Sequence, residues 1–123
     1  MAKKPVVVSW EDHIDEKREE IETRIGLGQA RILVAIEACG RNAYGLAIEQ
    51  HVRAQGGKPM SEPQVYVSLK RMAARALIEI VEKRKVPNTP PIIIYKLTKR
   101  GKDALTRKLA ELGPLAAAVL SRP

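Results

Sequence analysis

The stretch SEPQVYVSLKRM, residues 61–72, decides the fold of this chain. Ser61 and Gln64 have the spacing of a capping box, in which two side chains satisfy backbone N–H groups at a helix start, and Pro63 is tolerated in the first turn. Apolar residues follow at the spacing of one helix face: Val65, Leu69, Met72, Ala73 and Ala76. The pattern predicts a capped helix that runs to about Arg75.

Two further helices are predicted upstream of the capped helix. ARILVAIEAC, residues 30–39, is an apolar run of helix length that ends before a glycine, and we interpret it as the central core helix. Asn42 can cap the next helix, AYGLAIEQHVRAQ at residues 43–55, and Gly56 and Gly57 stop it. Only a short connection then separates this helix from the capped one, as in a helix-turn-helix.

A hairpin and a last helix are predicted downstream. LIEIVEK, residues 77–83, and IIIYKL, residues 92–97, are short β-branched runs joined by a proline-rich segment, which predicts two strands with a stiff tip. Thr98 then starts a helix through Leu112. A hairpin after a helix-turn-helix is typical of the winged form, whose later helix enters the major groove of DNA. We therefore expect a mainly α fold with a small β-hairpin wing.

Near both ends of the chain, apolar residues recur on one face of a predicted helix. Such a narrow apolar strip, called a seam below, predicts that the helix packs against another protein surface. In the acidic N-terminal segment, the residues on one helix face are Trp10, Ile14, Ile21 and Ile25. On the last helix the repeated positions are Leu105, Leu109 and Leu112. We expect an N-terminal dimerisation or docking helix at 1–25, a winged-helix body at 26–98, and a C-terminal dimerisation helix with an apolar tail at 99–123. The alternative is that both seams cover the core of their own domain.

The charge of the chain suggests a polyanionic partner. The net charge is +8, and residues 1–25 hold five Lys/Arg against seven Asp/Glu, so the positive charge belongs to the rest of the chain. Aromatic residues make up only 3% and Phe is absent, which argues against the stacking platforms that read single strands and RNA. Duplex DNA is therefore the expected partner.

On the capped helix, the face opposite the apolar one presents residues suited to a DNA groove. Gln64 and Arg71 can make bidentate contacts to adenine and guanine edges, and Val67 can touch a thymine methyl group. Ser68 or Lys70 can hold phosphates. The plainer interpretation is that the basic residues form only a solvated face. The order of the surrounding elements favours contact with DNA.

Three segments resemble the PadR family of winged-helix transcriptional regulators and arrive in the family's order. They are GRNAYGLAI at residues 40–48, SEPQVYVSLKRM at 61–72 and YKLTKRGKDAL at 95–105. The resemblance covers about residues 30–108, and MarR-like relatives share much of it. It implies a DNA-binding regulator whose recognition helix includes the matching residues Ser61, Tyr66, Leu69, Lys70 and Arg71.

Two positions depart from the family's pattern. Val67 stands where the family commonly has a proline, which should not alter the fold. The wing has the segment 90–94, PPIII, where many relatives place basic residues, so minor-groove contact by the tip is not expected. Arg84 and Lys85 are expected to contact the DNA backbone from the other side of the hairpin, and residues 92–94 to face both the core and a neighbouring subunit.

The expected function is sequence-specific binding of double-stranded DNA by a transcriptional regulator, a repressor that binds an inverted repeat as a homodimer. The expected DNA contacts are Ser61, Gln64, Tyr66, Val67, Ser68, Lys70, Arg71, Arg75, Arg84 and Lys85. The alternatives are a winged-helix protein-interaction module and a nonspecific nucleic-acid-binding protein. A small-molecule effector lacks support in a chain with so few aromatic residues.

Enzyme chemistry, cofactors and metals are not expected. The only cysteine is Cys39 and the only histidines are His13 and His51, too few for a structural zinc site or an internal disulfide. Packing explains Cys39 and His51, and phosphate-loop, GxSxG and HExxH motifs are missing from the sequence. No apolar run approaches the roughly 18 residues that cross a bilayer, and MAKKPVVVSW at residues 1–10 is unlike a signal peptide, so a cytoplasmic location is expected.

Overall fold

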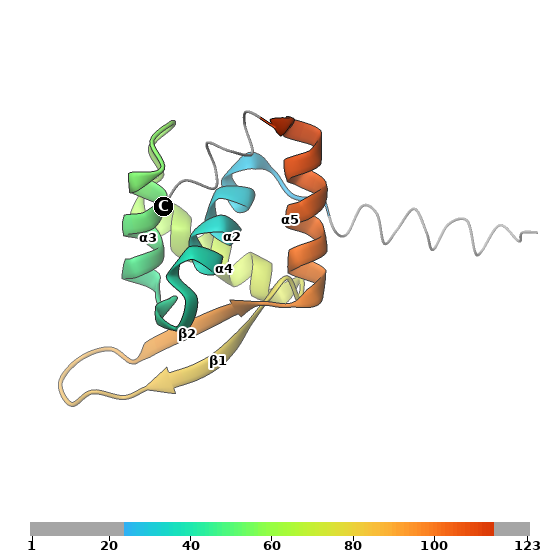
Figure 1. Cartoon of the computed structure of the whole chain (residues 1–123). Coiled ribbons are helices and arrows are strands. Elements are labelled where there is room, and N and C mark those ends of the chain that lie inside the picture. Colours follow the sequence, from blue (N-terminus) through green and yellow to red (C-terminus); the bar gives the residue numbers. More distant parts are fainter. Residues whose placement is uncertain (1–23, 115–123) are drawn as a thin grey trace, which may run out of the picture.

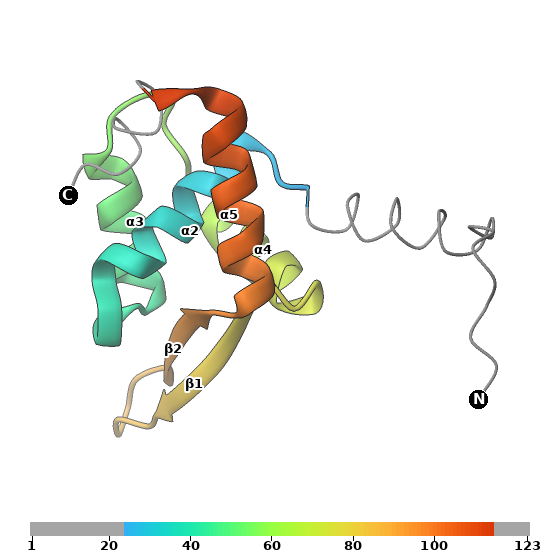
Figure 2. The ribbon, with the colours of Figure 1, turned by 45° about the vertical axis from the view of Figure 1, so that its right-hand side comes forward.

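The computed structural model describes residues 24–114, and within them the elements follow in the predicted order. They are helix α2 (Leu27–Cys39), the short 3-10 helix η1 (Gly40–Asn42), helices α3 (Gly45–Ala54) and α4 (Glu62–Ala74), strands β1 (Ile78–Arg84) and β2 (Ile92–Leu97), and helix α5 (Lys99–Leu112). The hairpin of β1 and β2 extends from one end of the helices in both views (Figure 1, Figure 2). The prediction of a mainly α fold with a β-hairpin wing is confirmed.

Helix α4 begins as its sequence predicts. The backbone N–H of Ser61 donates to Gln64 Oε1 over 2.8 Å, and the backbone N–H of Gln64 donates to Ser61 Oγ over 3.3 Å. The helix ends at Ala74, and Ala76 then takes a left-handed conformation (φ 59°) that turns the chain into β1. Such a cap contributes about 1 kcal/mol, so short-range interactions fix where α4 starts.

Helix α3 begins later than its sequence predicts, and Asn42 is not its cap. Asn42 ends η1, and Tyr44, in an extended conformation, occupies the N-cap position without a side-chain cap. The physical reason is a long-range pairing. The Ala43 carbonyl accepts a hydrogen bond from the N–H of Tyr95 on β2 over 2.9 Å, and Tyr44 forms an isolated antiparallel bridge with Ile94. Tyr44, which forms this bridge, is extended, so the helix cannot start until Gly45.

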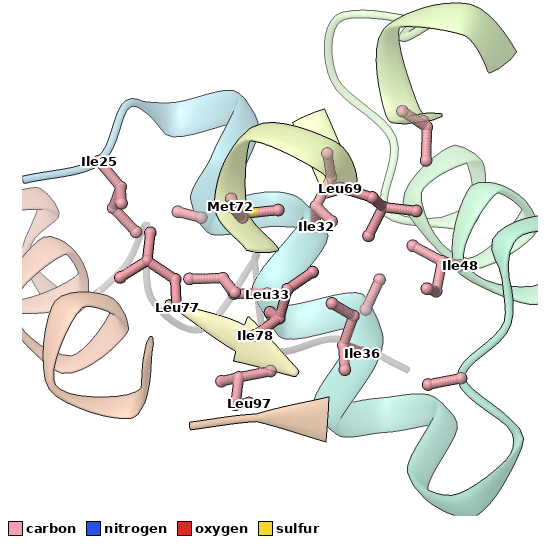
Figure 3. Packing of buried hydrophobic residues seen from close by; sticks show 14 of the residues in the cluster. Ile25, Ile32, Leu33, Ile36, Ile48, Leu69, Met72, Leu77, Ile78 and Leu97 are labelled. Atoms are coloured by element: carbon pink, nitrogen blue, oxygen red, sulfur yellow. The ribbon is translucent and has the colours of Figure 1, made fainter. Parts of the chain in front are cut away.

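Helix α2 forms the centre of the core. Residues 30–36 are all buried, and α3, α4, β2 and α5 all pack on this helix. Large side chains from α2, α3, α4, the chain after α4 and the two strands meet there: Ile32, Leu33, Ile36, Ile48, Leu69, Met72, Leu77, Ile78 and Leu97 (Figure 3). Burial of each of these side chains stabilises the folded state by about 1.5–3 kcal/mol. The apolar run at 30–39 is therefore the core helix that was expected.

The hairpin is anchored at its base and exposed along most of its length. Strands β1 and β2 are antiparallel, with Ile78 opposite Leu97 at the base and Arg84 opposite Ile92 at the far end. Within β1 only Ile78 is buried. On β2, Ile94 is buried against the body, whereas Ile92 and its neighbour at position 93 are half-buried. The wing thus projects from the core and leaves apolar surface on β2 partly open.

Helix α5 is built into the same core as the elements before it. The Thr98 hydroxyl accepts from the N–H of Gly101 over 3.0 Å and donates to the carbonyl of Ala76 over 2.6 Å. Ala104 is buried in the core cluster, and Leu105 packs against it. The core therefore continues across residue 98, where we expected the winged-helix body to end.

The residues expected to form a dimer seam lie in different environments. Ile25 is 7% exposed and belongs to the protein's own core, so it offers no free surface to a partner. Leu109 and Leu112 are half-buried on α5. Trp10, Ile14 and Ile21 lie outside the described residues. Across residues 24–114, no helix has the length and apolarity that a membrane span requires.

Candidate nucleic-acid interface

Helix α4 turns one face to the core and the opposite face to solvent. Val65, Leu69 and Met72 are buried, whereas Val67, at 47% exposure, is among the exposed large hydrophobic residues. Near Val67 on this side, Gln64, Lys70 and Arg71 are exposed and Ser68 is half-buried. Glu62, Pro63, Tyr66 and Ala74 are also exposed on α4. An exposed apolar side chain between an amide and a guanidinium suits a groove in which thymine methyl groups lie beside hydrogen-bonding base edges.

A groove runs beside this face of α4. It has a volume of about 560 Å³ and lies between the start of α2, the loop at residues 58–60 and α4. The α4 residues that line it are Pro63, Gln64, Val67, Ser68 and Arg71. Among the described residues of the lining, Arg31, Lys58 and Arg71 are basic and none is acidic. The fold thus brings four of the expected contacts, Gln64, Val67, Ser68 and Arg71, to one positively charged surface.

Tyr66 lies at the junction of α3 and α4. Its ring covers Gly45, where an added Cβ would lie 2.5 Å from Tyr66 Cε1 and 2.6 Å from Tyr66 Oη. A larger residue at the start of α3 would therefore have to displace the Tyr66 ring. Burial, followed by the charges of Glu62 and Glu49, raises the pKa of the Tyr66 hydroxyl. Since the side chain remains 44% exposed, this hydroxyl can still donate a hydrogen bond.

Arg75 has partners inside the protein. Its Nη2 donates to the carbonyl of Arg24 over 2.8 Å, and its Nη1 donates to Gln29 Oε1 over 3.4 Å. These contacts join the end of α4 to the start of α2. Arg75 is absent from the lining of the groove that holds Gln64 and Arg71. The structure therefore places Arg75 where it holds α4 in position.

Arg84 is the last residue of β1, and Lys85 follows it. Arg84 forms an ion pair with Glu82, and the hydrogen bond and charge of this carboxylate raise the pKa of the guanidinium. Arg84 lines a second hollow of about 780 Å³, between the end of α2 and the hairpin, together with Arg41 and Lys96. The wing residues are therefore separate from the groove beside α4.

Arg31 is a residue that the sequence analysis did not single out. It is only 7% exposed on the core helix α2, and it is one of the residues that line the groove beside α4. A signal was available, because Arg31 is the one charged residue in the first half of the apolar run ARILVAIEAC at 30–39. A charge placed where burial is expected needs hydrogen-bond partners, and the fold supplies them from α3 and the loop after it.

Cys39 and His51 are two described residues whose types could carry chemistry, and Cys39 packs against the core. Burial raises the pKa of the Cys39 thiol, which disfavours the reactive thiolate. Both ring nitrogens of His51 are buried without a hydrogen-bond partner in the described part of the chain. Within residues 24–114, no group of three or more His, Cys, Asp or Glu side chains is arranged to hold a metal ion.

Two packed helices, a capped third helix with an exposed polar face and a following hairpin define a winged-helix protein. The chain belongs to the family described as "Transcriptional regulator PadR-like family", whose model matches residues 32–107. It is thus a member of a family of transcriptional regulators rather than of enzymes, and the resemblance found in the sequence is confirmed.

Solved structures of PadR-family proteins resemble this chain. A PadR family transcription regulator from Clostridium difficile R20291 has 29% sequence identity and a TM-score of 0.58, with 70% of this chain and 86% of that chain covered. A PadR family transcriptional regulator from Eggerthella lenta has 22% identity and a TM-score of 0.55, with 89% and 91% covered. A PadR-like transcription factor from Bacteroides fragilis has 21% identity and a TM-score of 0.53, with 88% and 95% covered. No curated protein matches the chain.

Proposed function

We propose that this protein is a repressor that recognises a specific sequence in double-stranded DNA and binds it as a homodimer on an inverted repeat. The observation that carries the proposal is the exposed face of α4, where Gln64, Val67 and Arg71 line one groove with the basic residue Lys58. A protein-interaction module needs no such combination of a bidentate amide, a bidentate guanidinium and a surrounding positive charge.

The proposed contacts divide into base readout and phosphate binding. Gln64 reads adenine, Arg71 reads guanine, and Val67 contacts a thymine methyl group in the major groove. Ser61, Ser68 and Lys70 hold phosphates, which position the helix without specifying a sequence. Arg84 and Lys85 contact the backbone farther along the duplex, and Tyr66 and Arg75 hold α4 against α3 and α2.

A homodimer is proposed because one winged helix buries too little DNA surface for a tight and selective site. The half-buried Leu109 and Leu112 on α5 offer an apolar strip that a second copy could cover, with Trp10, Ile14 and Ile21 as further candidates outside the described residues. A two-fold arrangement would place two α4 helices about 34 Å apart on successive major grooves. Repression would follow where such a site overlaps a promoter.

Selection of bound fragments from random duplex DNA tests the proposal. With the full chain at physiological salt, we expect enrichment of one inverted repeat and binding at least about 10³-fold tighter than to random duplex. Equal binding of selected and random duplexes, or of RNA, would instead indicate a nonspecific nucleic-acid-binding protein. No measurable binding to any duplex would favour the protein-interaction module.

A further inference from the structure

Arg31 makes a set of hydrogen bonds that cross from α2 to α3 and to the loop after it. Its Nε donates to Gln55 Oε1 over 3.1 Å, and its Nη1 donates to the Lys58 carbonyl over 2.5 Å. Its Nη2 donates to the carbonyls of Val52 and Gly56 over 3.2 and 3.0 Å. In return, Gln55 Nε2 donates to the carbonyl of Arg31 over 2.9 Å. Arg31 and Gln55 therefore bind each other in both directions while Arg31 holds three backbone carbonyls.

These acceptors are all neutral, which is unusual for a buried charge. Carbonyls at the end of α3 carry the negative pole of the helix, so they favour a cation there. A lysine could not replace this arrangement, since its single ammonium lacks the planar, forked donors that reach separate acceptors. The geometry of the guanidinium, in addition to its charge, is therefore required to hold all four acceptors.

The carbonyls that Arg31 holds span the connection between α3 and α4. This connection includes Gly56 and Gly57, both with φ of 77°, a conformation that glycine adopts without strain. Glycines permit the turn but do not restrict it to one shape. The Arg31 guanidinium fixes the turn before, within and just after the glycine pair, and α4 begins only four residues beyond Lys58.

We infer that Arg31, together with Gln55, is a positioning residue for base recognition: it fixes the turn that presents the exposed face of α4. The inference rests on the proposed function. Arg31 lines the same groove as Gln64 and Arg71, so any relaxation of the turn displaces the base-reading side chains relative to the rest of the interface. Phosphate contacts tolerate such a shift because they depend mainly on charge, whereas bidentate base contacts depend on geometry.

The test compares affinity for the duplex selected by the wild-type chain with affinity for a random duplex, over a range of salt concentrations. We expect Arg31→Lys, which keeps the charge, to lower the ratio of the two affinities about tenfold, the size of a weakened bidentate contact. The affinity for random duplex and its salt slope should change little. Arg41→Met, which removes an exposed arginine on η1, should leave the ratio unchanged.

Gln55→Ala provides a second variant that leaves Arg31 intact. It should also lower the ratio of the affinity for the selected duplex to that for the random duplex. A melting temperature for each variant confirms that the chain is folded. Retention of the wild-type ratio by folded Arg31→Lys and Gln55→Ala would overturn the inference. So would equal loss on both duplexes, which would show that Arg31 and Gln55 support binding in general and not base recognition. A wild-type chain without any preferred duplex would contradict the proposed function itself, and the role of Arg31 would fall with it.

Discussion

A side-chain carbon added to Gly101 would lie 1.9 Å from the carbonyl oxygen of Leu77. The backbone of Gly101, in the first turn of α5, therefore packs directly against Leu77, which lies between α4 and β1. The same Leu77 carbonyl accepts a hydrogen bond from the N–H of Thr98 over 3.1 Å, so the start of α5 and the base of the wing share one backbone group. Helix α5 is therefore attached to the base of the wing through main-chain contacts.

Gly101→Ala should destabilise the fold by about 1–3 kcal/mol or more, because the obstructing atom belongs to the backbone and cannot rotate away. Thermal or urea unfolding measures the effect. The matched control is Gly28→Ala in α2, where the added carbon meets only the flexible end of Met60 at 3.4 Å. It should be neutral or slightly stabilising. Similar free energies of unfolding for the two variants would show that α5 does not pack against the Leu77 backbone as described.

Gln64→Glu separates helix capping from base recognition. Gln64 Oε1 accepts from the N–H of Ser61, and a glutamate can fill this role in a capping box, so stability should stay within about 0.5 kcal/mol of wild type. The adenine preference should be lost, since the carboxylate has no donor for adenine N7, and cytosine should be favoured at that position. A repeated selection from random DNA measures this. An unchanged consensus would remove Gln64 from base readout.

Lys70→Ala should weaken binding to all duplexes alike. Lys70 is exposed on α4 and absent from the lining of the groove that holds Gln64 and Arg71, in keeping with a phosphate contact. Its loss should lower the slope of log affinity against log salt by about 1 and leave the consensus unaltered. Affinities measured at several salt concentrations provide the slope, and a shifted consensus would contradict this role.

Leu109→Lys with Leu112→Lys should convert the dimer to a monomer. Sedimentation of the wild-type chain at micromolar concentration should give twice the chain mass of 13.6 kDa, and the double variant should give one chain mass without loss of helix content. The charge-matched control is Thr106→Lys with Ala110→Lys, since both of these α5 positions are exposed. A monomeric wild-type chain, or a double variant that remains dimeric, would contradict the proposed interface.

The elements that the sequence predicted well are those defined by nearby residues. The capping box of Ser61 with Gln64 and the cap at Thr98 both operate within three residues, and α4 and α5 start where these patterns indicate. The start of α3 was wrong because the deciding hydrogen bond joins Ala43 to Tyr95 on a strand far along the chain. Such pairings leave no local pattern.

The candidate site could be predicted only in part. The outward face of α4 followed from helical periodicity, and Gln64, Val67 and Arg71 are indeed exposed together. Periodicity cannot show that Arg75 is bonded to Arg24, nor that Arg31 reaches an amide 24 positions away in Gln55. Both depend on how separate helices pack.

The central claim is that the exposed face of α4 reads base pairs, and Arg71 tests it most directly. Each base pair of the selected site is replaced in turn, and the affinities of wild type and Arg71→Ala are compared for every replacement. Replacement of one G·C pair in each half-site should cost wild type about 1–3 kcal/mol and the variant almost nothing. A variant that weakens equally on selected and random duplexes, and still discriminates at every position, would contradict the claim.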